Sequence, residues 1–115
     1  MYYGWADPAL NAMMGVEYYE KVLAKMGTVT SDYFRLFMVP GMFHCGGGPG
    51  CGTVDWFATL VEWVENRKAP ESIVGARMVD GKAVRTRPLC RYPQVARYTG
   101  SGSIDDAANF TCGKP

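Results

Sequence analysis

The spacing of apolar side chains predicts an amphipathic helix near the start of the chain. Over residues 8–26 the apolar positions recur every three or four residues, at Ala12, Val16, Tyr19, Leu23 and Met26. Pro8 suits the first turn of a helix, and Gly27 suits the residue that follows its last turn. We therefore predict a helix over residues 8–26, with one apolar stripe facing a core.

A second helix is predicted over residues 53–67. Thr53 can cap its first turn, and Asp55 suits the positive end of the helix dipole. The polar positions form a single stripe, at Asp55, Thr59, Glu62 and Asn66. Apolar and aromatic side chains cover the remaining surface, so we expect this helix to be mostly buried.

The apolar runs between and before these helices predict strands. Residues 33–39 are short, apolar and aromatic and end at Pro40, which favours a strand buried on both faces of a parallel sheet. Residues 1–4 resemble the last part of a strand, so we expect upstream sequence to be absent. Strands that alternate with helices predict an α/β fold.

The last third of the chain predicts a hairpin and an irregular tail. Two strand-like runs, 73–79 and 82–86, flank Asp80-Gly81, which is a strong hairpin signal. From Arg87 onward the prolines and glycines indicate irregular structure. A disulfide between Cys90 and Cys112 would hold such a tail, and closing about 20 residues is worth roughly 3 kcal/mol. Four cysteines nevertheless allow three full pairings.

Length and charge narrow the possible functions. The 115 residues, 48% of them hydrophobic, suffice for one compact domain over 1–115. The net charge of +1 gives no general attraction to nucleic acid or to an anionic membrane. Basic side chains do gather in the hairpin and tail, at Arg77, Lys82, Arg85, Arg87, Arg91 and Arg97. No nucleic-acid motif accompanies them, and no apolar run reaches the roughly 20 residues of a membrane span.

The only histidine, His44, lies in the glycine-rich segment 40–52, directly after a predicted strand. The segment lacks the Lys-Ser/Thr of a P-loop, so phosphate binding is not indicated. Imidazole is the usual general base of enzymes, and loops at strand ends are where such bases stand. His44, Cys45 and Cys51 could also be three metal ligands, but no fourth ligand stands at a matching spacing.

A histidine base needs a carboxylate to hold its tautomer, and Asp7 is the best placed acid. It follows the first predicted strand and precedes the first helix, whereas the other acids lie on helix surfaces or in a turn. The order Asp then His is also the order at the end of an α/β hydrolase. From its position alone, Asp7 could equally be an ordinary helix cap.

Two motifs make the resemblance specific. The segments Gly4-Trp-Ala-Asp-Pro8 and Val39-Pro-Gly-Met-Phe-His-Cys-Gly-Gly-Gly-Pro-Gly50 resemble the C-terminal motifs of the tannase/feruloyl esterase family. The late cysteine pair also resembles that family's C-terminal disulfide. The resemblance covers nearly the whole chain. It implies the C-terminal part of an α/β-hydrolase fold, with parallel strands and flanking helices, then a hairpin and a disulfide-tied tail.

The resemblance also implies roles. Asp7 would be the triad acid, His44 the base, and Cys45 half of a disulfide to an absent upstream cysteine beside the serine nucleophile. Cys51 matches no disulfide of the family. The substrate would be a small aromatic-acid ester of the feruloyl or galloyl type, and the location secreted or periplasmic. No cofactor is expected here, although the family's lid domain often binds calcium.

The chain departs from the family in what it lacks. There is no G-x-S-x-G elbow, and neither an oxyanion-hole segment nor a lid is present. We therefore expect an inactive C-terminal fragment of a serine ester hydrolase, whose partner is the missing N-terminal part. The alternative is a small, non-catalytic secreted module stapled by two disulfides, Cys45–Cys51 and Cys90–Cys112.

Overall fold

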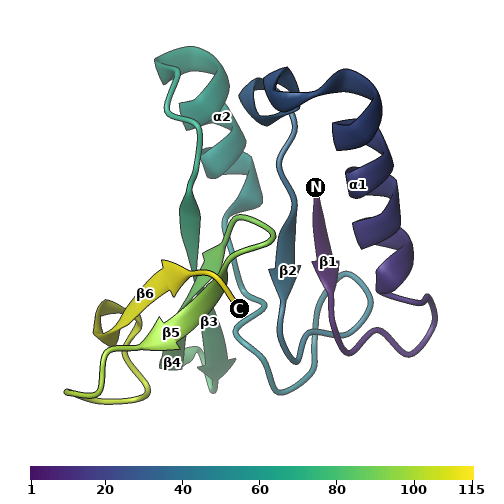
Figure 1. Ribbon diagram of the computed structural model, residues 1–115. Helices are drawn as coiled ribbons and strands as arrows, with labels where there is room; N and C mark the ends of the chain where they lie inside the picture. The colour runs from purple at the N-terminus through teal and green to yellow at the C-terminus, as the bar shows by residue number, and fades with distance from the viewer.

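The computed structural model describes residues 1–115 and has an α/β architecture built around two parallel strands. β1 (Tyr2–Gly4) pairs with β2 (Phe37–Val39), and α1 (Met13–Met26) connects them. Figure 1 shows the two arrows side by side and pointing the same way, with α1 on one side and α2 (Trp56–Asn66) on the other. The predicted parallel strands and flanking helices are therefore confirmed.

Alternate residues of β2 supply two separate cores, because successive strand side chains point to opposite faces. Met38 of β2 and Leu36 just before it pack with Val16 and Tyr19 of α1 and with Ala12, which precedes that helix. Phe37 and Val39 pack on the other face with Met42 and Leu89, and Trp56 covers that cluster. A strand buried on both faces was the prediction for residues 33–39. Its burial is confirmed, but the strand is shorter than predicted, because only Phe37–Val39 pair with β1 and residues 33–36 lie outside any strand.

The first helix begins later than predicted. The residues from Pro8 to Ala12 form bends and turns, and α1 starts at Met13. The Asn11 side chain competes for the backbone here, because it accepts a hydrogen bond from the Met13 amide, which a helix beginning at Pro8 would direct to Ala9 O. The C-terminal end matches the prediction, since Gly27 takes a positive φ of 75° and donates to Leu23 O at 2.8 Å.

The second helix differs from its prediction in its cap and its burial. Asp55 rather than Thr53 caps it, by accepting a 2.8 Å hydrogen bond from the Ala58 amide, while Thr53 bridges to Ala76. None of its residues is buried, and Phe57 is 78% exposed. Only one side of α2 meets the sheet, so its remaining apolar surface has no partner among these residues. Neither helix has the length and apolar content that a bilayer crossing requires.

The predicted hairpin is confirmed and is longer than expected. β3 (Ser72–Val79) and β4 (Lys82–Cys90) pair antiparallel around Asp80 and Gly81, which take the positive φ values of 48° and 75°. Such a turn matches the twist of the flanking strands. Two of the basic side chains have acidic partners, because Arg85 of β4 pairs with Asp105, and Arg91, which follows β4, pairs with Glu71.

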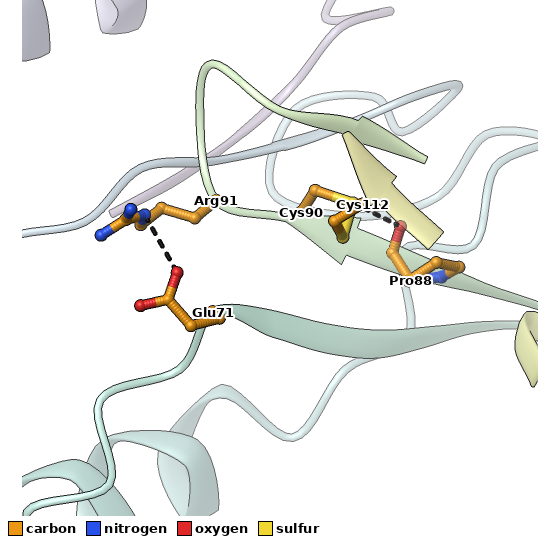
Figure 2. Close-up of a disulfide and its surroundings, with 5 residues drawn as sticks. All are labelled: Glu71, Pro88, Cys90, Arg91 and Cys112. Atoms are coloured by element: carbon orange, nitrogen blue, oxygen red, sulfur yellow. Dashed lines mark hydrogen bonds and ion pairs between the residues drawn. A yellow bond between two sulfur atoms is a disulfide. The ribbon is translucent and has the colours of Figure 1, made fainter. Parts of the chain in front are cut away.

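The tail is more regular than predicted. β5 (Val95–Tyr98) and β6 (Phe110–Gly113) form a third two-stranded sheet, and a short 3₁₀ turn at Ala107–Asn109 leads into β6. Another 3₁₀ turn, at Thr28–Asp32, follows α1 outside the tail. Cys90 at the end of β4 is bonded to Cys112 in β6, with their Cα atoms 5.6 Å apart. Figure 2 shows this bond beside the Glu71–Arg91 ion pair. The disulfide therefore fixes the β5–β6 sheet to the hairpin.

We expect the double substitution Cys90→Ser/Cys112→Ser to lower the free energy of unfolding by about 3 kcal/mol, because it releases a loop of 22 residues in the unfolded chain. Urea unfolding of the longer polypeptide, followed by circular dichroism, measures the loss. Cys51→Ser is the matched control, since Cys51 is a buried cysteine without a disulfide. An unchanged midpoint in the double variant would show that β5 and β6 hold the tail without the bond.

Candidate active site

The candidate site forms where β1 and β2 end side by side. Because the strands are parallel, the segments that follow them leave the same edge of the pair. The Trp5 amide donates to Val39 O at 3.0 Å, and the Ala6 amide donates to Met42 O at 3.1 Å. These two bonds continue the strand pairing and hold the Asp7 segment against the His44 segment.

The structure brings Asp7 and His44 into direct contact. Asp7 Oδ2 lies 2.7 Å from His44 Nδ1, although 37 residues separate them in the sequence. Asp7 Oδ1 accepts hydrogen bonds from the amides of Ala9 at 2.8 Å and Leu10 at 3.0 Å. Asp7 therefore holds a local turn and is the partner of the histidine. It is not a helix cap, because α1 begins only at Met13 with Ala12 at its cap position.

The surroundings of Asp7 favour its ionised form. Its side chain is only 2% exposed. Desolvation on burial raises the pKa of the carboxyl, but the hydrogen bonds from His44, Leu10 and Ala9 outweigh it. The net effect holds the pKa of Asp7 below its ordinary value, so the carboxylate stays charged at neutral pH and can orient the imidazole.

This lowered pKa predicts an acid-sensitive contribution to stability. A carboxyl whose pKa is lower in the folded than in the unfolded state stabilises the fold fully above the unfolded value, and loses that effect as pH falls through the folded value. We expect unfolding free energies measured between about pH 5 and pH 2 to fall more steeply for the parent than for Asp7→Asn. Identical slopes would contradict the prediction. Asp80→Asn, in the hairpin turn, is the control.

His44 presents its other ring nitrogen for chemistry. Its side chain is half exposed, and the contact to Asp7 occupies Nδ1, which leaves Nε2 available. The ring borders a hollow of about 130 Å³, lined by Tyr2, Tyr3, Gly4, Asp7, Leu10, Met42, His44 and Cys45. None of the four serines lines it. A larger hollow of about 410 Å³ lies beside Cys90 and is lined by neither Asp7 nor His44. We therefore place the candidate site at the acid–base pair and not at the larger hollow.

The glycines of the His44 segment serve close backbone packing. The Gly50 amide donates to Gly41 O at 3.0 Å, which folds the segment back on itself. A Cβ atom at Gly48 or Gly50 would overlap the backbone of residues 40–41. Met42 is buried beneath the turn, with 1% of its surface exposed. The segment is irregular, as predicted, and its packing fixes the backbone that carries His44.

The free cysteines separate the two function classes considered for this chain. Cys45 is exposed and Cys51 is buried, and the two are not bonded. The stapled-module alternative, which required a Cys45–Cys51 disulfide, is therefore wrong. The Cys51 Sγ lies 3.7 Å from Arg85 O, and desolvation raises the pKa of its thiol. No three His, Cys, Asp or Glu side chains gather as a metal-ligand set, and the calcium expectation concerns a lid that these residues do not form.

Comparison with known proteins decides the family. A model of the tannase and feruloyl esterase family matches residues 1–113. The chain belongs to the tannase and feruloyl esterase family. It is 48% identical over 118 residues to the mono(2-hydroxyethyl) terephthalate hydrolase of Piscinibacter sakaiensis. This alignment covers 100% of this chain and 19% of that protein. It is 33% identical over 129 residues to feruloyl esterase B of Aspergillus niger, across 96% of this chain and 25% of the relative.

The fold agrees with this family. The crystal structure of feruloyl esterase B from Aspergillus oryzae matches with a TM-score of 0.90 and 26% identity, over 97% of this chain and 26% of that one. The tannase and feruloyl esterase relatives are carboxylic-ester hydrolases. The chain spans about a fifth to a quarter of the length of the relatives it matches.

Sequence reasoning identified Asp7 and His44 but missed what holds them together. The amides of Ala9 and Leu10, which fix the second carboxylate oxygen, belong to a stretch predicted as helix. An Asp followed by Pro is a known turn signal and indicated the local bonding. The contact between Gly4 and the His44 segment has no comparable signal, because it depends on how two distant segments pack.

Proposed function

We propose that this chain is the C-terminal portion of a serine carboxylic-ester hydrolase of the tannase and feruloyl esterase family, and that it supplies the acid and the base of the catalytic triad. The observation that carries the proposal is the 2.7 Å contact between His44 Nδ1 and Asp7 Oδ2. The carboxylate is shielded from water while the imidazole is half exposed. Such a pair can hold one tautomer and still reach a substrate.

The mechanism follows from the two nitrogens of His44. A serine from the preceding part of the polypeptide attacks the ester carbonyl while Nε2 takes its proton. The imidazolium that forms is stabilised through Nδ1 by the Asp7 carboxylate. His44 then returns the proton to the departing alcohol, and water repeats the sequence on the acyl-enzyme to release the acid.

Cys45 supports this arrangement through its backbone. It takes a φ of 59°, a conformation that glycine adopts easily and other residues rarely do, in a segment where glycines follow directly. A side chain at this strained position indicates that the thiol itself is needed. We propose that Cys45 bonds an upstream cysteine next to the serine, which would tie the nucleophile to the base.

The substrate class and the compartment are part of the proposal. The substrate is a small aromatic-acid ester, which relatives named as feruloyl esterases and as a terephthalate hydrolase support. The Cys90–Cys112 bond suits an oxidising compartment, so the enzyme is proposed to be secreted or periplasmic. Its partner is the N-terminal part of the same enzyme, and any calcium is proposed to bind in the lid.

The test is an assay of the longer polypeptide that contains these residues. Ester hydrolysis is measured with feruloyl, galloyl and terephthaloyl esters, and with aliphatic esters as the comparison. The proposal expects turnover of at least one aromatic ester and covalent labelling by a serine-directed phosphonate. An enzyme that resists the phosphonate and cleaves no ester would refute it.

A further inference from the structure

Gly4, the last residue of β1, lies against the backbone that leads into His44. It is buried, and a Cβ atom built on it would overlap the carbonyl oxygens of both Met42 and Phe43. Both approaches are closer than 3.0 Å, a separation that real Cβ atoms essentially never show. The overlapped atoms belong to the main chain, so rotating a side chain cannot relieve the overlap.

The two segments that meet at Gly4 are each held on the remaining sides. The Ala6 amide donates to the same Met42 oxygen at 3.1 Å, and the Trp5 amide donates to Val39 O at 3.0 Å. Met42 is fully packed among Phe37, Val39 and Leu89. The His44 backbone therefore cannot retreat into the core, and a group added at Gly4 must separate the two segments.

Separation of these segments acts directly on the acid–base pair. Asp7 lies three residues after Gly4, and His44 lies two residues after Met42. Both connections are short and hydrogen-bonded, so a shift at Gly4 reaches Asp7 Oδ2 and His44 Nδ1. Their 2.7 Å separation leaves little tolerance, because a hydrogen bond weakens as the atoms move beyond about 3.2 Å.

We propose that Gly4 is a positioning residue, whose missing side chain sets the distance between Asp7 and His44. The inference rests on the proposed function, because it assigns Gly4 a role in the chemistry of that pair. Gly4 touches neither substrate nor reacting atoms. It acts through the carbonyls of Met42 and Phe43.

The test is Gly4→Ala in the longer polypeptide. We expect kcat to fall about 10²-fold with KM little changed, since a displacement of about 1 Å costs that much in rate. We also expect loss of the strongly deshielded proton resonance that a short imidazole–carboxylate hydrogen bond gives. Gly46→Ala, two residues after His44, is the matched control, because a Cβ atom there meets nothing within 4 Å. It should keep the resonance and most of the rate.

The outcomes separate this inference from the proposed function. A folded Gly4→Ala enzyme with the resonance and the rate intact would overturn the inference, and so would an equal loss in Gly46→Ala. Where Gly4→Ala does not fold, Ala6→Pro removes the amide that donates to Met42 O and should weaken the same resonance. An unchanged resonance there would also overturn it. If the resonance disappears in Gly4→Ala while His44→Ala keeps its activity, the positional role stands and the proposed triad fails.

Discussion

His44→Ala in the longer polypeptide is expected to lower kcat by roughly 10⁴- to 10⁶-fold, with little effect on the melting temperature. The effect is large because triad members act as a unit, so a serine without its base cannot attack at a useful rate. The structural cost is small because the His44 side chain is half exposed and makes one side-chain hydrogen bond, to Asp7. Steady-state hydrolysis of an aromatic ester, measured beside a thermal unfolding curve, gives both quantities.

Two comparisons sharpen that experiment. Asp7→Asn should cost about 10⁴-fold, because the amide holds the imidazole in the wrong tautomer. The double variant should be little worse than His44→Ala alone, since the carboxylate acts through the histidine. Asp55→Asn, which alters the cap of α2 instead, should keep the parent rate. A His44→Ala enzyme with near-normal kcat would remove His44 from the mechanism.

The second large effect concerns these 115 residues expressed alone, which we expect to show no turnover of aromatic-acid esters. The pair His44–Asp7 is a base without a nucleophile, because none of the four serines borders the hollow at His44. General-base assistance is worth only about 10²- to 10⁴-fold, far below what covalent catalysis with an oxyanion hole supplies.

The control for this experiment uses the chain's own hydroxyl groups. Any residual hydrolysis should persist when the serines at 31, 72, 101 and 103 are replaced together by alanine, because it would come from the solvent-exposed imidazole of His44 acting as a base. Steady turnover that disappears on replacing one of those serines would identify a nucleophile in the chain and contradict the fragment interpretation.

The strands and helices were largely predictable because their patterns are local. The period of the apolar residues identified both helices, and Asp80-Gly81 identified the hairpin. The errors occur where tertiary contacts decide. The extent of α1 was overestimated because the Asn11 side chain takes the Met13 amide that a longer helix would have used, and the tail was expected to be irregular although β5 and β6 pair across it.

The burial of α2 shows a different limit of sequence reasoning. Its pattern of apolar residues is that of a covered helix, yet Phe57, Leu60 and Val64 are more than half exposed. The pattern records which surfaces avoid water, but it does not say which segment covers them. The sequence therefore predicts that α2 is a helix, but it does not predict which of the helix's surfaces are covered.

The site was predictable in its residue types and not in its geometry. A lone histidine after a strand and an aspartate after another strand indicated a pair, and their motifs indicated the family. The contact itself depends on the parallel register of β1 with β2, in which Gly4 pairs with Val39. A shift of that register by one residue would move the two side chains apart, and no local pattern reports it.

The acid and the base belong to one β–α–β segment, which runs from β1 through α1 to the turn after β2. Their contact closes a loop of moderate length. The entropic cost of closing such a loop is small, because that cost grows only slowly with the number of residues in the loop. In a growing or refolding polypeptide, the proposed acid and base can thus come together within a single contiguous stretch. In the proposed enzyme, the serine would have to be brought to this pair by a contact between far more distant parts of the polypeptide. Activity would then report the last long-range step of folding, and the Asp7–His44 hydrogen bond would report an earlier one.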